Sequence, residues 1–305
     1  MSRSTPICLM TLLALALTLL PVAAPPAPAA AQAQDFVALD ELPASEPPAA
    51  GDLDNDGDLD LVLGSTDGRL QLYFNAGNGT FAAGPELSTG TSSGQRPFVG
   101  DVNGDGRLDI VGGNQVFINN RQAYTASALP AGGRAFALGD LDGDGDLDVL
   151  VARPQALLQV YRNTGAGAFA AGPELPNSET VSSVVLGDLD ADGVLDYAFN
   201  GGRVIFNDGA GGASREYQAP VDFARDVAFG DMNSDGSFDI IVWSPGNIAI
   251  IHNTGAGYFA EPVLLNISLT ESLTVADFDS DGDLDLALGY ICTRHCGVYQ
   301  LSEIL

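Results

Sequence analysis

Short apolar runs rich in β-branched residues recur along most of the chain, separated by clusters of glycine, asparagine and aspartate. Examples are LVLG at 61–64, VLVA at 149–152 and IIVW at 240–243. Runs of four to six such residues, bounded by turn-forming clusters, predict strands rather than helices. Long amphipathic helical patterns are hard to find, so the pattern predicts an all-β protein.

A polar nine-residue motif punctuates these strands with a period near 45 residues. All six copies obey D-x-[DN]-x-D-G-x-[LF]-D, and they start at Asp52, Asp101, Asp140, Asp188, Asp231 and Asp277. An apolar run ending in glycine precedes most copies, and a β-prone run follows each. A further run then ends in asparagine, and a glycine turn leads into a last strand. Each unit therefore reads as four strands with a carboxylate loop between the first two.

Four antiparallel strands in about 45 residues is the size of a β-propeller blade. We therefore predict a six-bladed β-propeller over residues 34–305. The alternative is an open solenoid, which usually needs distinct polar end caps. The last unit ends after a third strand around 297–303, and residues 35–42 resemble the fourth strands elsewhere. We expect this N-terminal strand to complete the last blade and close the ring.

Residues 1–33 follow the plan of a secretory signal peptide. Arg3 precedes an apolar run over 7–20, and an A-x-A site lies at 31–33, before Gln34. An uncleaved membrane anchor is the alternative, but the apolar run is short for a span. We expect a secreted, extracellular or cell-surface protein that has no membrane span after cleavage.

Two cysteines, Cys292 and Cys296, lie beyond this leader in the sequence CTRHC. In an oxidising compartment their spacing predicts a small disulfide loop. A zinc site that includes His295 is the alternative, although two cysteines and one histidine supply only three ligands.

The net charge of the chain limits the classes of binding partner. The 305 residues carry a net charge of −28, all twelve cationic side chains are arginine, and apolar residues reach 46%. Such acidity argues against nucleic acid or an anionic membrane surface as the partner. The apolar content excludes a disordered acidic tail.

The carboxylate loops predict calcium sites. Acidic or amide side chains at motif positions 1, 3, 5 and 9 repel one another unless a cation lies among them, and all-oxygen ligands suit calcium. Position 6 is always glycine, as a positive φ requires. Position 7 varies, which fits a ligand that offers only its backbone carbonyl, and position 8 is expected to point into the blade. Magnesium, which usually keeps several waters, and solvated turns without metal are the alternatives.

An EF-hand is excluded because position 12 is never acidic: its residues are Leu63, Gly112, Val151, Phe199, Val242 and Leu288. The predicted ligands, for up to six Ca²⁺, are Asp52, Asp54, Asp56, Asp58, Asp60, Asp101, Asn103, Asp105, Arg107, Asp109, Asp140, Asp142, Asp144, Asp146, Asp148, Asp188, Asp190, Asp192, Val194, Asp196, Asp231, Asn233, Asp235, Ser237, Asp239, Asp277, Asp279, Asp281, Asp283 and Asp285.

The loops, together with N-x-G-x-G-x-F turns such as 75–81 and 163–169, resemble the FG-GAP/VCBS repeats of integrin α-subunit propellers and of many secreted bacterial proteins. The resemblance covers roughly residues 35–305. It implies calcium between the first and second strands of each blade, and a role in adhesion or ligand recognition. Integrin propellers have seven blades, whereas this sequence provides six repeats. The turn is eroded at 119–124 and expanded at 207–217.

We therefore expect a monomeric recognition module for an extracellular protein or glycan. A lectin-like or carbohydrate-active propeller is the alternative. Catalysis needs placed acids, bases or nucleophiles. Beyond the leader the only histidines are His252 and His295, which have no evident partners, and the clustered aspartates are assigned to calcium. We do not expect an enzyme.

Three arginines, Arg96, Arg134 and Arg225, precede first strands and are predicted to rim the channel on the face opposite the loops. Trp243 and Tyr290 end second strands and are expected to reach the same face. Arginine and exposed aromatics are enriched at binding hot spots. The alternative is that the arginines only balance acids such as Asp226.

Overall fold

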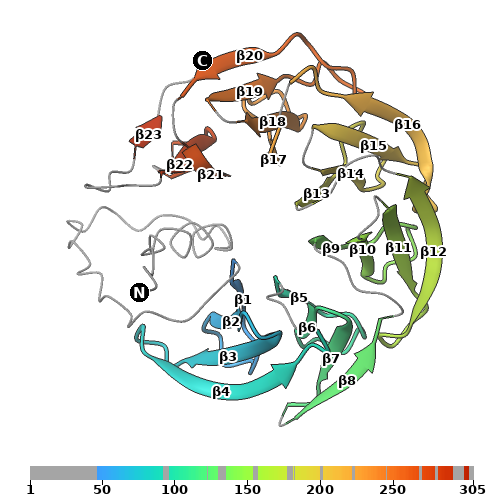
Figure 1. The fold of residues 1–305 in the computed structure, drawn as a ribbon, viewed down its shortest axis with the longest axis vertical. Helices are drawn as coiled ribbons and strands as arrows, with labels where there is room; N and C mark the ends of the chain where they lie inside the picture. Colours follow the sequence, from blue (N-terminus) through green and yellow to red (C-terminus); the bar gives the residue numbers. More distant parts are fainter. Residues whose placement is uncertain are drawn as a thin grey trace, which may run out of the picture.

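The computed structural model describes residues 47–91, 96–121, 123–129, 135–153, 157–176, 181, 183–199, 202–221, 224–244, 246–267, 270–278, 281–290 and 299–301. Within these ranges the chain is all-β and forms six antiparallel sheets, which we number as blades in chain order (Figure 1). Five of the described sheets have four strands and the sixth has three.

Blade 1 comprises β1 (Ala49–Gly51), β2 (Asp60–Gly64), β3 (Arg69–Asn75) and β4 (Phe81–Ser88). Blade 2 comprises β5 (Phe98–Gly100), β6 (Asp109–Gly112), β7 (Gln115–Asn119) and β8 (Tyr124–Ala128). Blade 3 comprises β9 (Ala135–Gly139), β10 (Asp148–Arg153), β11 (Leu157–Asn163) and β12 (Phe169–Pro176).

Blade 4 comprises β13 (Val184–Gly187), β14 (Asp196–Phe199), β15 (Arg203–Asn207) and β16 (Ala213–Gln218). Blade 5 comprises β17 (Asp226–Gly230), β18 (Asp239–Ser244), β19 (Asn247–Ile251) and β20 (Val263–Asn266). Blade 6 comprises β21 (Thr270–Ala276), β22 (Asp285–Tyr290) and β23 (Tyr299–Leu301).

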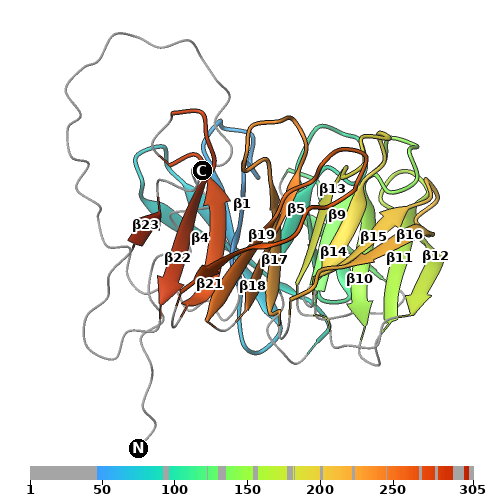
Figure 2. The same cartoon turned by 90° about the horizontal axis from the view of Figure 1, so that it is seen from above.

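The blades follow one another around a common centre, with each first strand innermost and each described fourth strand outermost (Figure 1). Seen from the side, the strands run between two faces of a disc (Figure 2). The propeller-like arrangement of strands and carboxylate loops is therefore confirmed. In Figure 1, β1 and β21 stand at the two ends of an arc and not side by side. Closure into a ring of six blades thus stays a prediction.

The core lies between blades. Each of five clusters of buried residues draws on two consecutive blades. The second strand of each blade contributes to the core on both of its sides, because alternate side chains of a strand point to opposite faces of the sheet. In β10, Val149 and Val151 pack against blade 2, whereas Leu150 packs against blade 4. Second strands buried on both faces explain why their sequences are continuously apolar.

A glycine at the end of each of the first five first strands lets the next blade approach closely. A Cβ added to Gly51 would lie 2.6 Å from Leu108 Cδ1, and one on Gly139 would lie 2.7 Å from Leu195 Cδ1. Leu108 and Leu195 occupy position 8 of the loop motif. The expectation that position 8 points into its own blade is therefore wrong: these side chains pack against the preceding blade.

Several expectations concern residues outside the described ranges. They are the signal peptide at 1–33, the closing strand at 35–42 and the disulfide between Cys292 and Cys296. No helix capable of spanning a membrane occurs in the part of the chain that the structure describes.

Candidate metal centres and ligand surface

The six motif copies form loops that join the first and second strands of each blade on one face of the disc. We number them loop 1 (52–60), loop 2 (101–109), loop 3 (140–148), loop 4 (188–196), loop 5 (231–239) and loop 6 (277–285). The glycine at position 6 has a positive φ in every loop, between 81° and 100°. In the five loops where position 4 is described, it also adopts a positive φ, even where it is Asn55, Ala191 or Ser234.

Position 1 holds the loop in its folded shape. In loop 1, Asp52 Oδ1 accepts a hydrogen bond from the Asp56 amide at 3.1 Å, and Oδ2 accepts one from the Gly57 amide at 3.0 Å. The amide of position 6 donates to the position 1 carboxylate in all six loops. The position 1 carboxylate therefore fixes the shape of the loop by accepting hydrogen bonds from its backbone amides.

Position 9 is buried in every loop, with side chains such as Asp60 and Asp148 fully inaccessible to solvent. Both oxygens of Asp148 accept backbone hydrogen bonds, from Leu141 N at 3.0 Å and Asn163 N at 2.8 Å. Burial raises the pKa of Asp148 and of Asp196 to about 6, although these backbone bonds oppose the shift. Position 9 therefore ties its loop to the third strand as well as offering oxygen to a cation.

In blades 2 to 5 an asparagine at or just beyond the end of the third strand links neighbouring loops, a role that sequence reasoning missed. Asn163 Nδ2 donates to Leu147 O in its own blade at 3.2 Å and to Val102 O in blade 2 at 2.7 Å. Asn119, Asn207 and Asn253 repeat this bridge to the blade before them. The signal was present, because five of the apolar runs end in asparagine at the same place in the repeat.

Three loops bring carboxylates together in a way that fits a cation. Ligand atoms at positions 1, 3 and 9 lie within 4.8 Å of one another in loops 1, 3 and 4. At position 3 of loops 3 and 4, Asp142 Oδ1 and Asp190 Oδ1 are buried and have no hydrogen-bond partner. A buried carboxylate oxygen without a hydrogen-bond partner is a position where a water or an ion can bind. Carboxylates without nitrogen or sulfur ligands suit a hard divalent cation such as Ca²⁺.

Other predicted ligands are placed differently. Position 5 residues such as Asp56 and Asp144 are exposed and accept the amide of position 7. Asp279 lies outside the described residues. Cationic or imidazole groups approach four loops: Arg107 contacts Asp105, Arg162 lies 3.5 Å from Asp142, Arg215 lies 3.5 Å from Asp190, and His252 Nδ1 lies 3.0 Å from Asp239 Oδ2.

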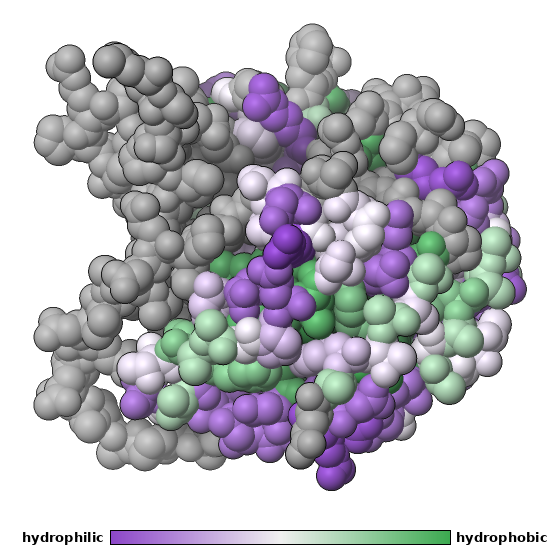
Figure 3. Space-filling view, turned by 60° about the horizontal axis from the view of Figure 1, so that its bottom comes forward, coloured by the Kyte–Doolittle hydropathy of each residue, from purple (hydrophilic) through white to green (hydrophobic). Residues whose placement is uncertain are grey.

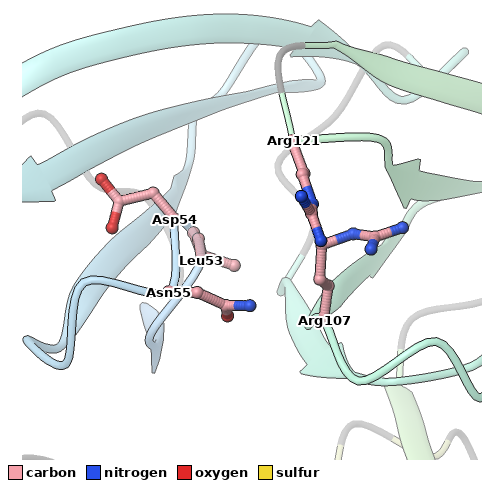
Figure 4. Close-up of a pocket in the computed structure, with 5 residues that line it drawn as sticks. All are labelled: Leu53, Asp54, Asn55, Arg107 and Arg121. Carbon is pink, nitrogen blue, oxygen red and sulfur yellow. The ribbon is translucent and has the colours of Figure 1, made fainter.

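A surface pocket of about 240 Å³ lies between loop 1 and blade 2. Its lining residues are Leu53, Asp54, Asn55, Arg107 and Arg121. Figure 4 shows the two arginines on the blade 2 side of the pocket, across from the three loop 1 residues. The pocket thus offers two guanidinium groups across from the Asn55 amide, on the face that carries the loops.

Two of the three arginines predicted to form a ligand face lie beside aromatic rings. Arg96 lies 5.3 Å from the ring centre of Phe98, and Arg225 lies 5.7 Å from that of Trp243. The expectation that Trp243 is exposed is wrong: it is 4% exposed and packs in the core between blades 5 and 6. Arg134 and the side chain of Tyr290 lie outside the described residues. In the space-filling view, described hydrophilic and hydrophobic residues are interspersed (Figure 3).

Known structures share this fold at low sequence identity. An Agrocybe aegerita lectin that recognises non-reducing terminal N-acetylglucosamine matches with a TM-score of 0.58 and 20% identity, over 83% of this chain and 79% of the lectin chain. A Bacillus licheniformis rhamnogalacturonan lyase matches with a TM-score of 0.55 and 16% identity, over 79% of this chain and 54% of the lyase chain. BBS1N, in complex with ARL6DN, matches with a TM-score of 0.55 and 11% identity, over 80% of this chain and 75% of that chain.

No curated protein matches the chain in sequence. The FG-GAP-like repeat family matches three segments, residues 52–112, 140–199 and 231–288. Together these segments span more than half of the chain, and each begins at the first residue of a carboxylate loop. The chain therefore belongs to the family of FG-GAP-like repeat proteins.

Proposed function

We propose that this protein is a secreted, calcium-stabilised recognition propeller that binds an extracellular glycan or protein without transforming it. The observation that carries the proposal is the convergence of three carboxylates in loops 1, 3 and 4, with the unpartnered oxygens of Asp142 and Asp190. Like charges at this spacing destabilise the fold unless a cation lies among them. The ions would be structural, and the loops would hold a rigid surface for a ligand.

Calcium dependence is the first test. A ligand that binds only the folded state stabilises it by RT ln(1 + [L]/Kd) for each site. We expect the Tm measured with millimolar calcium to exceed the Tm in EDTA by more than 5 °C, with magnesium giving a smaller increase. Equal Tm values in calcium and EDTA contradict calcium binding by the loops.

The pocket beside loop 1 is the proposed ligand site. Its volume of about 240 Å³ suits a single sugar ring or side chain better than a long segment. A guanidinium group pairs with carboxylate or sulfate in fork geometry, and the Asn55 amide can bind a hydroxyl group. A glycan array probed with the calcium-loaded protein should therefore favour acidic sugars.

Arg121 provides the matched test of that site. It has a positive φ of 71°, a conformation that asparagine tolerates, so Arg121→Asn removes the guanidinium with little backbone strain. We expect this variant to lose array binding and keep its Tm. The control is Arg69→Asn on β3, an exposed arginine paired with Glu86, which should bind as the unchanged protein does. Equal array binding by the Arg121→Asn variant places the ligand elsewhere.

The alternative is a carbohydrate-active enzyme. It draws on the shared fold of the rhamnogalacturonan lyase, although the matched region is only about half of that chain. Each glycan bound on the array should be recovered unchanged after prolonged incubation with the calcium-loaded protein. Product formation that persists in highly purified protein would overturn the non-catalytic proposal.

A further inference from the structure

Loops 2 and 5 are nearly identical in their acidic residues but differ in one charge. Both carry Asp at positions 1, 5 and 9 and Asn at position 3, in DVNGDGRLD and DMNSDGSFD. In both, the position 3 amide donates to the position 5 carboxylate at 3.0 Å: Asn103 to Asp105 and Asn233 to Asp235. Position 7 is Arg107 in loop 2 and Ser237 in loop 5.

The guanidinium of Arg107 is held inside its own loop. Its NH2 group donates to Asp105 Oδ2, and Nε donates to Asn119 O at 2.9 Å. The side chain is only 19% exposed, so the contact is partly shielded from water. Asp105 Oδ1 accepts the Arg107 amide at 3.0 Å, as Asp235 Oδ1 accepts the Ser237 amide at 2.9 Å in loop 5. The guanidinium contact to Asp105 Oδ2 is therefore the feature that distinguishes loop 2.

The formal charge of the loop side chains also disfavours calcium in loop 2. Counting side chains at positions 1, 3, 5, 7 and 9, the formal charge is −2 in loop 2, −3 in loop 5 and −5 in loops 1 and 3. Calcium affinity rises with the number of charged ligands. An ion in loop 2 would have the weakest attraction of these and would displace an anchored guanidinium from Asp105.

We infer that loop 2 binds no calcium, because the Arg107 guanidinium comes from the loop itself, occupies Asp105 and leaves this loop with the least negative charge of the six. This departs from the sequence-based expectation of six similar sites. The inference rests on the proposed calcium binding of the remaining loops.

Exchanging position 7 between the two loops tests the inference. Calcium bound per chain is measured by equilibrium dialysis with elemental analysis for the unchanged protein, Arg107→Ser, Ser237→Arg and the double exchange. We expect Arg107→Ser to gain one ion, Ser237→Arg to lose one, and the double exchange to restore the original count. Because loop 5 also carries the His252 contact to Asp239, each loop is compared with itself.

Arg153→Ser is the control for net charge, because Arg153 at the end of β10 pairs with Glu174 and lies in no loop. It should leave the calcium count unchanged. If the Arg107→Ser variant fails to fold, the loss of one ion in Ser237→Arg remains the test. Unchanged counts in both single exchanges overturn the inference. No bound calcium in the unchanged protein would instead overturn the proposed function.

Discussion

Blades 1 and 3 share one motif, yet their faces toward the preceding blade differ. On blade 3, Val149 and Val151 pack against blade 2, and Asn163 donates to Val102 O across the interface. On blade 1, Leu61 and Leu63 hold the same motif positions but belong to none of the clusters formed by the described residues. Asn75, only half-buried, donates to Leu59 O within its own blade.

Blade 6, at the other end of the arc, also differs from the remaining blades, in the last residue of its first strand. Blades 1 to 5 end their first strands in glycine, and the next blade packs over it; blade 6 has Ala276 at this position. Added Cβ atoms on Gly51, Gly100, Gly139, Gly187 and Gly230 would lie 2.6–2.9 Å from a side chain of the next blade. Contacts this short are not tolerated. An interface between blades 6 and 1 could therefore resemble the others only if Leu59, at position 8 of loop 1, shifts away from the Ala276 methyl group.

The interface asparagines give the largest expected effect. Asn163→Ala should lower the free energy of unfolding by about 3 kcal/mol, because the buried Val102 O and the part-buried Leu147 O both lose their donor. Asn75→Ala removes a single such bond, and should lower it by about 1.5 kcal/mol.

Urea denaturation in EDTA measures both variants without a contribution from calcium. The control is Asn120→Ala, an exposed asparagine next to the interface residue of blade 2, which should change the free energy of unfolding by less than about 0.5 kcal/mol. Equal losses for Asn163→Ala and Asn75→Ala would mean that blade 1 has an interface equivalent to that of blade 3.

The strand-end glycines give an intermediate effect. In Gly139→Ala the new methyl group would meet Leu186 Cδ1 and Leu195 Cδ1, both at 2.7 Å, so we expect a loss of about 2 kcal/mol. Ala276→Gly removes a methyl group where the repeat has glycine, and should cost about 0.5–1 kcal/mol through backbone entropy alone. A stabilising Ala276→Gly would indicate that blade 6 packs against a neighbour as the other blades do. Thermal unfolding of the two variants distinguishes these outcomes.

The smallest effect concerns pH. Burial raises the pKa of Asp148 to about 6 and also raises the pKa of Asp60. A carboxyl whose pKa is raised in the folded state stabilises the calcium-free protein at low pH, and this stabilisation is lost as pH rises from about 4 to about 6. Calcium needs the ionised form, so the increase in Tm on adding calcium should be smaller at pH 5 than at pH 7.5.

Proton release sharpens that prediction. Calcium added to a weakly buffered solution at pH 6 should release protons, and Asp148→Asn should reduce the release. Asp144→Asn, which changes an exposed position 5 carboxylate in the same loop, should reduce it less. A calcium-induced Tm increase that is the same at both pH values would contradict the role of buried position 9 carboxylates.

Some features of the carboxylate loops were predicted from the sequence and others were not. The fixed glycine at position 6 predicted a positive φ, and every loop has one. The spacing of aspartates predicted convergence, which the structure shows for positions 1, 3 and 9 in loops 1, 3 and 4. The bridging role of Asn163 and its counterparts was missed because their partner carbonyls lie more than 60 residues away in sequence.

The sequence by itself determined the strands, their four-fold grouping into blades and the place of each carboxylate loop. Those features depend on local patterns: alternating burial, turn-forming glycines and repulsion among carboxylates a few residues apart. Tertiary structure alone decided which residues join one blade to the next. It buried Trp243, aimed position 8 at the preceding blade and left the first and last blades with unlike faces. Such contacts join segments of different repeats that lie far apart in the sequence. Loop closure and packing therefore select the neighbour, and no local pattern does.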